Sequence, residues 1–238
     1  MATLSIGMTV GVRQQGETTY DYCREALASL RLAGFTEPVH LFLEPGAEQH
    51  VPEDRTGLVL HQNEAKRGCF QNFRQGLRHL TKGHEAQYYL MLQDDALWAP
   101  GSSYVLQEKL DEAKTAKLGC LSPYTSKAMV PPRVKVSFQE TRKPQWAECE
   151  FYNKGFWGAV ALCFPHASAC AMESKSQRYR NHDHSRKLDV VVGNALKHDL
   201  RLKILVHVPS LVHLARHCQE SGQLEMAKEL DRKSTHLN

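Results

Sequence analysis

Two adjacent carboxylates, Asp94 and Asp95, are the residues of this chain whose type and spacing most directly suggest chemistry. They follow Tyr88-Tyr-Leu-Met-Leu-Gln, a run that predicts a strand buried on both faces, and Pro100-Gly101 predicts a turn after them. Strands of α/β sheets bind ligands at their carboxyl ends, and neighbouring carboxylates repel unless a cation lies beside them. The pattern predicts a Mg²⁺ or Mn²⁺ site shared with a diphosphate. Alternatively, the pair caps a helix beginning at Ser102 or Ser103.

Two further groups of residues suggest ligand contacts. Arg67 and Asn72 lie near the start of a helix predicted within residues 63–80, where the helix dipole favours an anion, although a solvated face is the alternative. In Gly155-Phe-Trp-Gly158, two glycines bracket two aromatic residues ahead of an apolar strand. That arrangement suggests close backbone approach to a ligand, and a buried core Trp is the alternative. His182 and His184 lie two apart in a polar loop, which is weak evidence for a metal site.

The elements that must position these residues alternate between strands and helices. The apolar periodicity and turn residues predict the strands 3–12, 39–43, 58–61, 88–93, 118–121, 158–165 and 203–207. Helices are predicted over 20–33, 104–117, 165–172 and 190–198. Residues 13–19 are predicted to be a loop, and the strand 203–207 is predicted to be the last one. Residues 122–150 are predicted to be an irregular insertion, with one hairpin strand at 134–138. Neither a GxGxxG motif nor a Walker loop is present, which disfavours dinucleotide and P-loop enzymes.

Composition predicts an ordinary globular protein. The 238 residues are 42% hydrophobic and 24% charged with a net charge of +4, as in one domain that buries a sizeable core. Seven cysteines without CxxC spacing favour a reducing compartment and neither a disulfide framework nor a zinc cluster. Without a signal-peptide pattern or an apolar run of about 20 residues, we expect a cytoplasmic protein that does not cross a membrane. The oligomeric state is not indicated.

The order of these pieces resembles the GT-A fold of nucleotide-sugar glycosyltransferases, in particular small bacterial and phage enzymes distantly like the N-acetylglucosaminyltransferase IV type. Tyr88-Tyr-Leu-Met-Leu-Gln-Asp-Asp95 is similar to that family's Tyr-Tyr-Leu-x-Leu-Glu-Asp-Asp, its version of the DxD motif, with Gln93 replacing an acid. The resemblance covers residues 5–217. It implies an α/β fold with a Rossmann-like mixed sheet flanked by helices, in a single domain over residues 1–218. Residues 219–238 are then a polar tail.

The resemblance also implies roles for individual residues. Asp95, Asp94 and His213 would hold Mn²⁺ or Mg²⁺, and His217 competes with His213 because the family usually has one more residue before this histidine. Asp189 would be the catalytic base, and the acceptor side would be formed by Gly155, Phe156, Trp157 and Gly158. The nucleotide-sugar would be held by Val10, Val12, Arg13, Arg67, Gly68, Asn72, Gln93 and Asp94.

The implied activity is transfer of a hexosyl or pentosyl group from a UDP-sugar to an acceptor hydroxyl, with inversion. Basic residues cluster on the expected acceptor side, which favours a hydroxymethylated pyrimidine in phage-type DNA as acceptor. They are Arg133, Lys135, Arg142, Lys143, Lys175, Arg178, Arg180, Arg186 and Lys187. A cytoplasmic glycan or protein is the alternative acceptor. A non-catalytic nucleotide- or sugar-binding module and a metal-dependent phosphodiesterase are alternatives of other classes.

Overall fold

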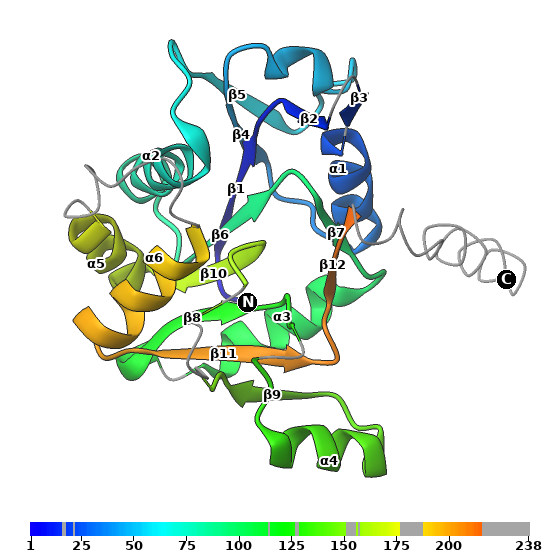
Figure 1. The fold of residues 1–238 in the computed structure, drawn as a ribbon, viewed down its shortest axis with the longest axis vertical. Coiled ribbons are helices and arrows are strands. Elements are labelled where there is room, and N and C mark those ends of the chain that lie inside the picture. Colours follow the sequence, from blue (N-terminus) through cyan, green and yellow to red (C-terminus); the bar gives the residue numbers. More distant parts are fainter. Residues whose placement is uncertain are drawn as a thin grey trace, which may run out of the picture.

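The computed structural model describes residues 1–15, 18–20, 22–113, 115–126, 129–150, 156, 158–176 and 188–215. Its centre is an eight-stranded mixed sheet in the order β5-β4-β1-β6-β10-β8-β11-β9 (Figure 1). The strands are β1 (Leu4–Val10), β4 (Val39–Leu43), β5 (Leu58–Gln62), β6 (Tyr88–Gln93), β8 (Leu118–Ser122), β9 (Gln145–Glu148), β10 (Ala161–Pro165) and β11 (Lys203–Val208). The predicted single mixed α/β architecture, Rossmann-like with helices on both faces, is confirmed.

The sheet divides into a parallel part and a mixed part. β1 runs parallel to both β4 and β6, and β4 runs parallel to β5, so four carboxyl ends lie at one edge. β10 is antiparallel to β6 and β8, whereas β11 is parallel to β8 and antiparallel to β9. β4 and β6 are buried on both faces because helices cover both faces, whereas the edge strand β5 is partly exposed.

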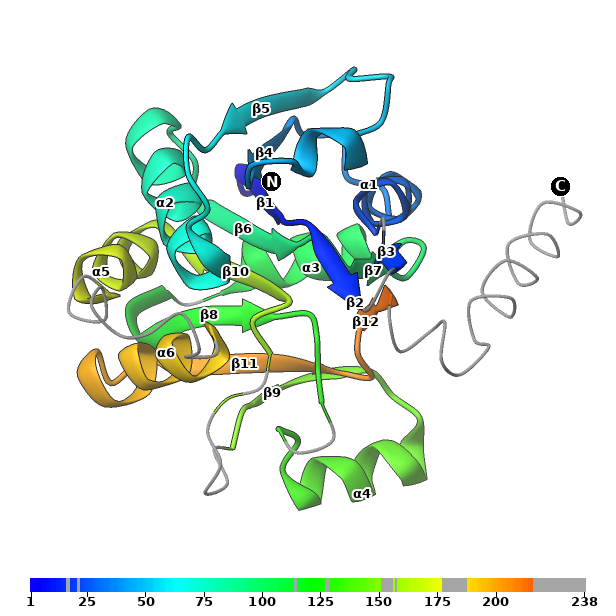
Figure 2. The same ribbon diagram turned by 45° about the horizontal axis from the view of Figure 1, so that its top comes forward.

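Helices cover the two faces with separate cores. α1 (Cys23–Leu32) and α3 (Ser102–Glu112) pack on one face, and α2 (Gly68–Gly83), α5 (His166–Ser176) and α6 (Leu188–Asn194) on the other (Figures 1 and 2). Leu30 and Leu106 belong to the first core, and Phe73 and Met172 to the second. The described connections include two 3₁₀ turns, Ala47–His50 and Thr115–Lys117, and a π-helical turn, Ala195–Asp199. Among the described residues, none of the helices is both long and apolar enough to span a bilayer.

The prediction of a strand over residues 134–138 is wrong, because the segment is helix α4 (Pro132–Thr141). Pro132 stands in the first turn, where its missing N–H costs no intrahelical hydrogen bond. No residue of α4 is buried, so the alternation of its apolar residues does not come from one face of a strand packing on the core. The predicted irregular insertion also contains β9, which pairs with β11 at the edge of the sheet.

Two smaller predictions are also wrong. The expected loop over residues 13–19 contains a hairpin of β2 (Arg13–Gln15) and β3 (Thr18–Tyr20). β11 is not the last strand, because β12 (Val212–Leu214) follows it and pairs with β7 (Ala96–Trp98), immediately after the acidic pair. Both are two-stranded ribbons of three residues a strand, too short for a periodic pattern. The predicted tail, 219–238, lies outside the described residues.

Close packing of α2 on the sheet depends on glycine. A Cβ atom at Gly76 would lie 2.7 Å from Cδ2 of Phe42 and 2.9 Å from Cε of Met91. Gly76→Ala should therefore lower the free energy of unfolding by about 1 kcal/mol or more, because overpacking outweighs the helix propensity gained by alanine. Urea denaturation measures this difference.

The matched control lies in the same helix. A Cβ atom at Gly83, the last residue of α2, would meet nothing within 4 Å. Gly83→Ala should be neutral or stabilising by up to about 1 kcal/mol. Equal destabilisation by both substitutions would contradict close packing at Gly76.

Candidate active site

The acidic pair lies at the carboxyl end of β6. Asp94 is 4% exposed and Asp95 is 1% exposed. Oδ2 of Asp94 accepts a hydrogen bond of 3.0 Å from the backbone N–H of Gly11, just beyond β1. Helix α3 instead has Gly101 at its N-cap and no side-chain cap. The pair therefore does not cap this helix, and Asp94 joins the ends of the two central parallel strands.

A pocket of about 340 Å³ opens beside Asp94. It is lined by Thr9, Val10, Gly11, Val12, Glu44, Pro45, Lys66, Gly68, Cys69, Asn72, Gln93 and Asp94. Six of the residues predicted to hold a nucleotide-sugar thus come together at one place. A larger hollow of about 650 Å³ lies near the amino ends of β1 and β6, beside Met1 and Gln87, away from the acidic pair.

One wall of the pocket favours negative charge. Helix α2 begins there at Gly68, whose φ of 76° lies in the left-handed region that favours glycine. The helix dipole and unpaired amides of a helix N-terminus attract anions, and Lys66 adds a positive charge to the lining. The side chain of Arg67 is exposed, and its backbone N–H points to Glu44. Arg13 is in β2, and its side chain is outside the description.

Glu44 is a site residue that the sequence did not reveal. It follows β4, lines the pocket and is 6% exposed. Its Oε2 accepts the Arg67 N–H at 2.7 Å, whereas Oε1 is buried and accepts no hydrogen bond from the described residues. A buried carboxylate oxygen without a donor is costly. Its position directly after a buried strand was the available signal, the same one that identified Asp94.

Asn72 and Gln93 form the pocket wall through protein contacts. Nδ2 of Asn72 donates to the Phe42 carbonyl at 2.8 Å, and its Oδ1 accepts from Asn63 at 3.0 Å. Nε2 of Gln93 donates to the Ala159 carbonyl at 2.8 Å. These side chains hold α2 against β4 and β6 against the start of β10, so their first role is to shape the pocket.

Asp189, far away in the sequence, reaches the same strand end. It lies in the first turn of α6, and its Oδ1 accepts a 2.9 Å hydrogen bond from the backbone N–H of Ala159. Ala159 thus contacts Asp189 through its N–H and Gln93 through its carbonyl. Because Gln93 directly precedes Asp94, one residue links Asp189 to the neighbour of the acidic pair.

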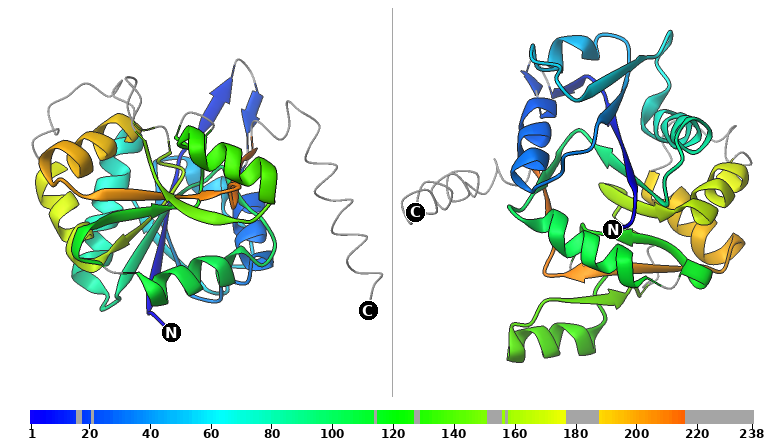
Figure 3. Two further views of the ribbon diagram at one scale, coloured as in Figure 1. Left: turned by 90° about the horizontal axis from the view of Figure 1, so that it is seen from below. Right: turned by 180° about the vertical axis from the view of Figure 1, so that it is seen from behind.

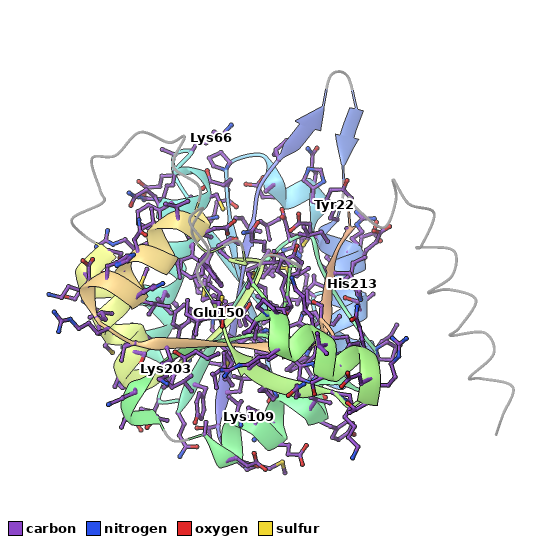
Figure 4. All side chains as sticks on the ribbon, turned by 60° about the horizontal axis from the view of Figure 1, so that its bottom comes forward. Tyr22, Lys66, Lys109, Glu150, Lys203 and His213 are labelled. Carbon is purple, nitrogen blue, oxygen red and sulfur yellow. The ribbon has the colours of Figure 1, made fainter. Side chains whose placement is uncertain are left out.

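His213 lies on the short β12–β7 ribbon. It pairs with Leu97, and the N–H of Ala215 donates to the Asp95 carbonyl at 2.9 Å. The ribbon therefore places His213 two residues along the chain from Ala215, whose N–H contacts the backbone of Asp95. Figure 4 labels His213 on β12 and Lys66 on the opposite margin of the site. Although His213 has exposed surface, partial burial lowers its pKa, which favours the neutral imidazole. His217 lies outside the described residues.

The predicted acceptor-side residues are only partly described. Phe156 is 1% exposed and belongs to the second core, and its ring would lie 2.8 Å from a Cβ atom at Gly158. Phe156 therefore presents no free face for stacking, and the buried-core alternative holds for this ring. Gly155, Trp157, His182 and His184 lie outside the described residues.

Comparisons with known proteins agree on the fold. No protein-family model matches the chain, and no curated protein sequence matches it. Among solved structures, a CMP:2-keto-3-deoxy-manno-octonic acid synthetase complexed with CTP aligns with a TM-score of 0.55 and 14% identity. The alignment covers 96% of this chain and 100% of the synthetase chain. A mannose-1-phosphate geranyltransferase from Thermus thermophilus aligns at 0.52 and 16% identity, over 87% and 73% of the two chains. The chain shares the Rossmann-like mixed α/β architecture of these transferases.

Proposed function

We propose that the protein is a metal-dependent glycosyltransferase that moves a sugar from a UDP-sugar to an acceptor hydroxyl. The proposal rests on one observation: Gln93 and Asp94 line one pocket, and Asp189 is tied to Gln93 through Ala159, which donates its N–H to Asp189 and accepts from Gln93. A pair of acids at a strand end, an anion-favouring helix start and a separate carboxylate are the parts that such a transfer needs. The fold is that of transferases acting on activated sugars and nucleotides.

The residues present fit a hard divalent cation. Asp94 and Asp95 are adjacent and almost fully buried, and carboxylate oxygens are the ligands that Mg²⁺ and Mn²⁺ prefer. Asp95, Asp94 and either His213 or His217 would hold the ion. When bound, it would offset the negative charge of the departing UDP diphosphate. The start of α2 and Lys66 would hold the same diphosphate from the other side.

Glu44 favours a base that carries an N–H donor. Uracil presents its N3–H on the Watson–Crick edge, whereas cytosine has an unprotonated acceptor nitrogen at that position. The carboxylate of Glu44, which lines the pocket, would accept the uracil N–H and would oppose the cytosine nitrogen. Guanine also carries an N–H on this edge, so the test includes GDP. Lining by Val10 and Val12 suits a flat apolar ring face.

Asp189 would act as the base. Its hydrogen bond from Ala159 fixes the carboxylate near the strand end that carries the acidic pair. In a single displacement, Asp189 takes the proton of the acceptor hydroxyl while the oxygen forms a bond to the anomeric carbon. The bond from that carbon to the UDP oxygen breaks with its electron pair leaving on UDP. Attack opposite the leaving group inverts the anomeric carbon.

The acceptor is proposed to be a hydroxymethylated pyrimidine in DNA. Helix α4 carries Arg133, Lys135 and Arg142 on or beside an exposed face, and Lys143 follows. In the left panel of Figure 3, α4 and the β2–β3 hairpin lie on the side of the sheet away from the N-terminus. Because β1 begins at that terminus, this is the side to which its carboxyl end and the pocket face. A polyanion bound along α4 would therefore lie on the site's side of the molecule.

A second function, nucleotidyl transfer, is favoured by one observation. The alignment with the synthetase complexed with CTP covers the whole length of the synthetase chain. Such an enzyme would join CTP and a sugar acid, with release of pyrophosphate. Release of pyrophosphate from CTP by the purified protein, with no turnover of UDP-sugars, would select this function.

Thermal unfolding with UDP, GDP, CMP and CTP, each with and without Mn²⁺, tests the donor site. We expect UDP with Mn²⁺ at about 100 times its Kd to raise Tm by about 5 to 10 °C, because ligand binding to the native state adds stability. UDP alone should give a much smaller shift, and Asp95→Ala should abolish the Mn²⁺-dependent part. A full shift in EDTA would contradict the metal site.

The two histidines are compared in the same assay. Whichever of His213→Ala and His217→Ala lowers the Mn²⁺-dependent shift is the ligand, and the other is its matched control. If both variants keep the full shift, the ion is held without a histidine.

Asp189→Asn separates catalysis from binding. We expect kcat to fall by about 10² to 10⁴ while the UDP and Mn²⁺ shift is retained, because the amide keeps the shape but does not accept the proton. Donor hydrolysis and transfer are followed by UDP release with a panel of UDP-sugars. Full turnover by Asp189→Asn would remove it from the role of base, and loss of the UDP shift would indicate a structural role instead.

DNA binding is tested at low and moderate salt. We expect the triple variant Arg133→Gln, Lys135→Gln, Arg142→Gln to bind duplex DNA at least about tenfold more weakly, with a shallower salt dependence. Arg55→Gln, Lys82→Gln, Lys117→Gln removes the same charge from exposed positions elsewhere and should bind like the wild type. Absence of wild-type binding at low salt would exclude the DNA acceptor and leave the glycan or protein acceptor.

A further inference from the structure

Four histidines gather between α2 and the outer strands of the sheet. His40 lies in β4, His61 in the edge strand β5, His79 in α2, and His84 directly follows α2. His40 is buried, His61 and His84 are half-buried, and His79 is exposed. None of them lines the pocket beside Asp94.

The group is distinct from the acidic pair. His40 pairs with Gly7 of β1, four residues before Gly11, which contacts Asp94. Four residues of extended strand span about 13 Å. The histidines therefore lie well back from the carboxyl ends, along the face of the sheet that α2 covers.

The ring nitrogens converge. One nitrogen each from His40, His79 and His84 lies within 4.8 Å of the other two. Nδ1 of His40 is 3.0 Å from Nε2 of His61, so a hydrogen bond between these rings orients His40. Zinc with Zn–N bonds of about 2.0–2.1 Å in tetrahedral geometry needs nitrogens about 3.3 Å apart. Small rotations of the exposed His79 and half-buried His84 rings would close the difference.

The chemistry of the group suits a borderline metal. Burial and the neighbouring imidazoles lower the pKa of His40 to about 4 and lower the pKa values of His61 and His79. For these three rings the shift favours the neutral form, which is the form that binds metal. Imidazole nitrogens favour Zn²⁺, Ni²⁺, Co²⁺ and Cu²⁺, whereas Mg²⁺ and Mn²⁺ favour oxygen. No carboxylate belongs to this group of converging ligands in the described part of the chain.

We propose that His40, His79 and His84 form a transition-metal site for Zn²⁺ or a similar divalent ion, with His61 as the positioning residue that holds the His40 ring. The ion links β4 to both the last turns of α2 and the residue after it. The ion would thereby link α2 to β4, the neighbour of the edge strand β5, and stabilise this outer part of the sheet. The site is independent of the glycosyltransferase proposal and needs neither donor nor acceptor.

Metal binding to untagged full-length protein tests the site. Equilibrium dialysis with Zn²⁺ and Ni²⁺ and the visible absorption of bound Co²⁺ report affinity and ligand geometry, and Tm reports stabilisation. We expect His79→Gln and His84→Gln each to weaken Zn²⁺ binding at least about tenfold and to remove the Tm shift, since loss of even an outer-shell partner costs 10–100-fold. Both side chains are accessible, so the variants should fold. His61→Gln should weaken binding less than either.

The control is His198→Gln, an exposed histidine in the π-helical turn, which should bind Zn²⁺ like the wild type. Equal binding by wild type, His198→Gln and the double variant His79→Gln, His84→Gln would place bound metal elsewhere and overturn the proposal. So would the absence of wild-type binding at micromolar Zn²⁺. Because UDP and Mn²⁺ binding is measured separately, loss of one site is distinguishable from loss of the other.

Discussion

The desolvation and mutual repulsion of two adjacent buried carboxylates is the constraint on which the rest of this structure depends. Removing the carboxylates of Asp94 and Asp95 from water is costly, and like charges brought close together repel each other. The Gly11 N–H offsets part of this cost by donating to the carboxylate of Asp94. Ala215 fixes the backbone of Asp95 by donating to its carbonyl. A cation beside the pair would complete the compensation, which ties the proposed function to the stability of the native state.

The mixed sheet explains how distant residues reach this pair. Parallel β1, β4 and β6 end at the same edge, and they bring Gly11, Glu44 and Asp94 to one pocket. The antiparallel β10 runs the other way, so its start, with Ala159 just before it, meets the end of β6. The N–H of Ala159 donates a hydrogen bond to Asp189 and so fixes the start of α6 beside this strand end. One reversed strand therefore delivers the proposed base to the end of the sheet that carries the donor site.

The two proposed metal sites differ in the way expected from their ligands. Oxygen ligands at a strand end, next to an anion-favouring helix start, suit an ion that is shared with a diphosphate. Neutral imidazoles between a helix and a sheet edge suit an ion that stays with the protein. The first would serve turnover and the second would serve stability, so removal of each ion has a different consequence.

Local patterns in the sequence predicted most strands and helices and the placement of Asp94 and Asp95 after a buried strand, and the order of these pieces, through its resemblance to a known fold, predicted the fold class. Such features are readable because they depend on neighbours a few residues apart: the apolar run of β6, the glycine after α1, the turn at Pro100-Gly101. α4 was misjudged because it packs no face into the core, so its apolar spacing carried no information about structure. The short β2–β3 and β12–β7 ribbons were missed because three residues hold too little periodicity.

Only the tertiary structure decided which residues meet. Glu44 became a site residue because β4 ends beside α2, and Asp189 is linked through Ala159 to Gln93, the neighbour of the acidic pair. Phe156, plausible as a stacking surface in the sequence, is buried because the second core closes over it. His40, His61, His79 and His84 show no metal-ligand spacing along the chain. They converge because the end of α2 brings His79 and His84 beside the rings of His40 and His61, a contact that depends on packing rather than on any local pattern.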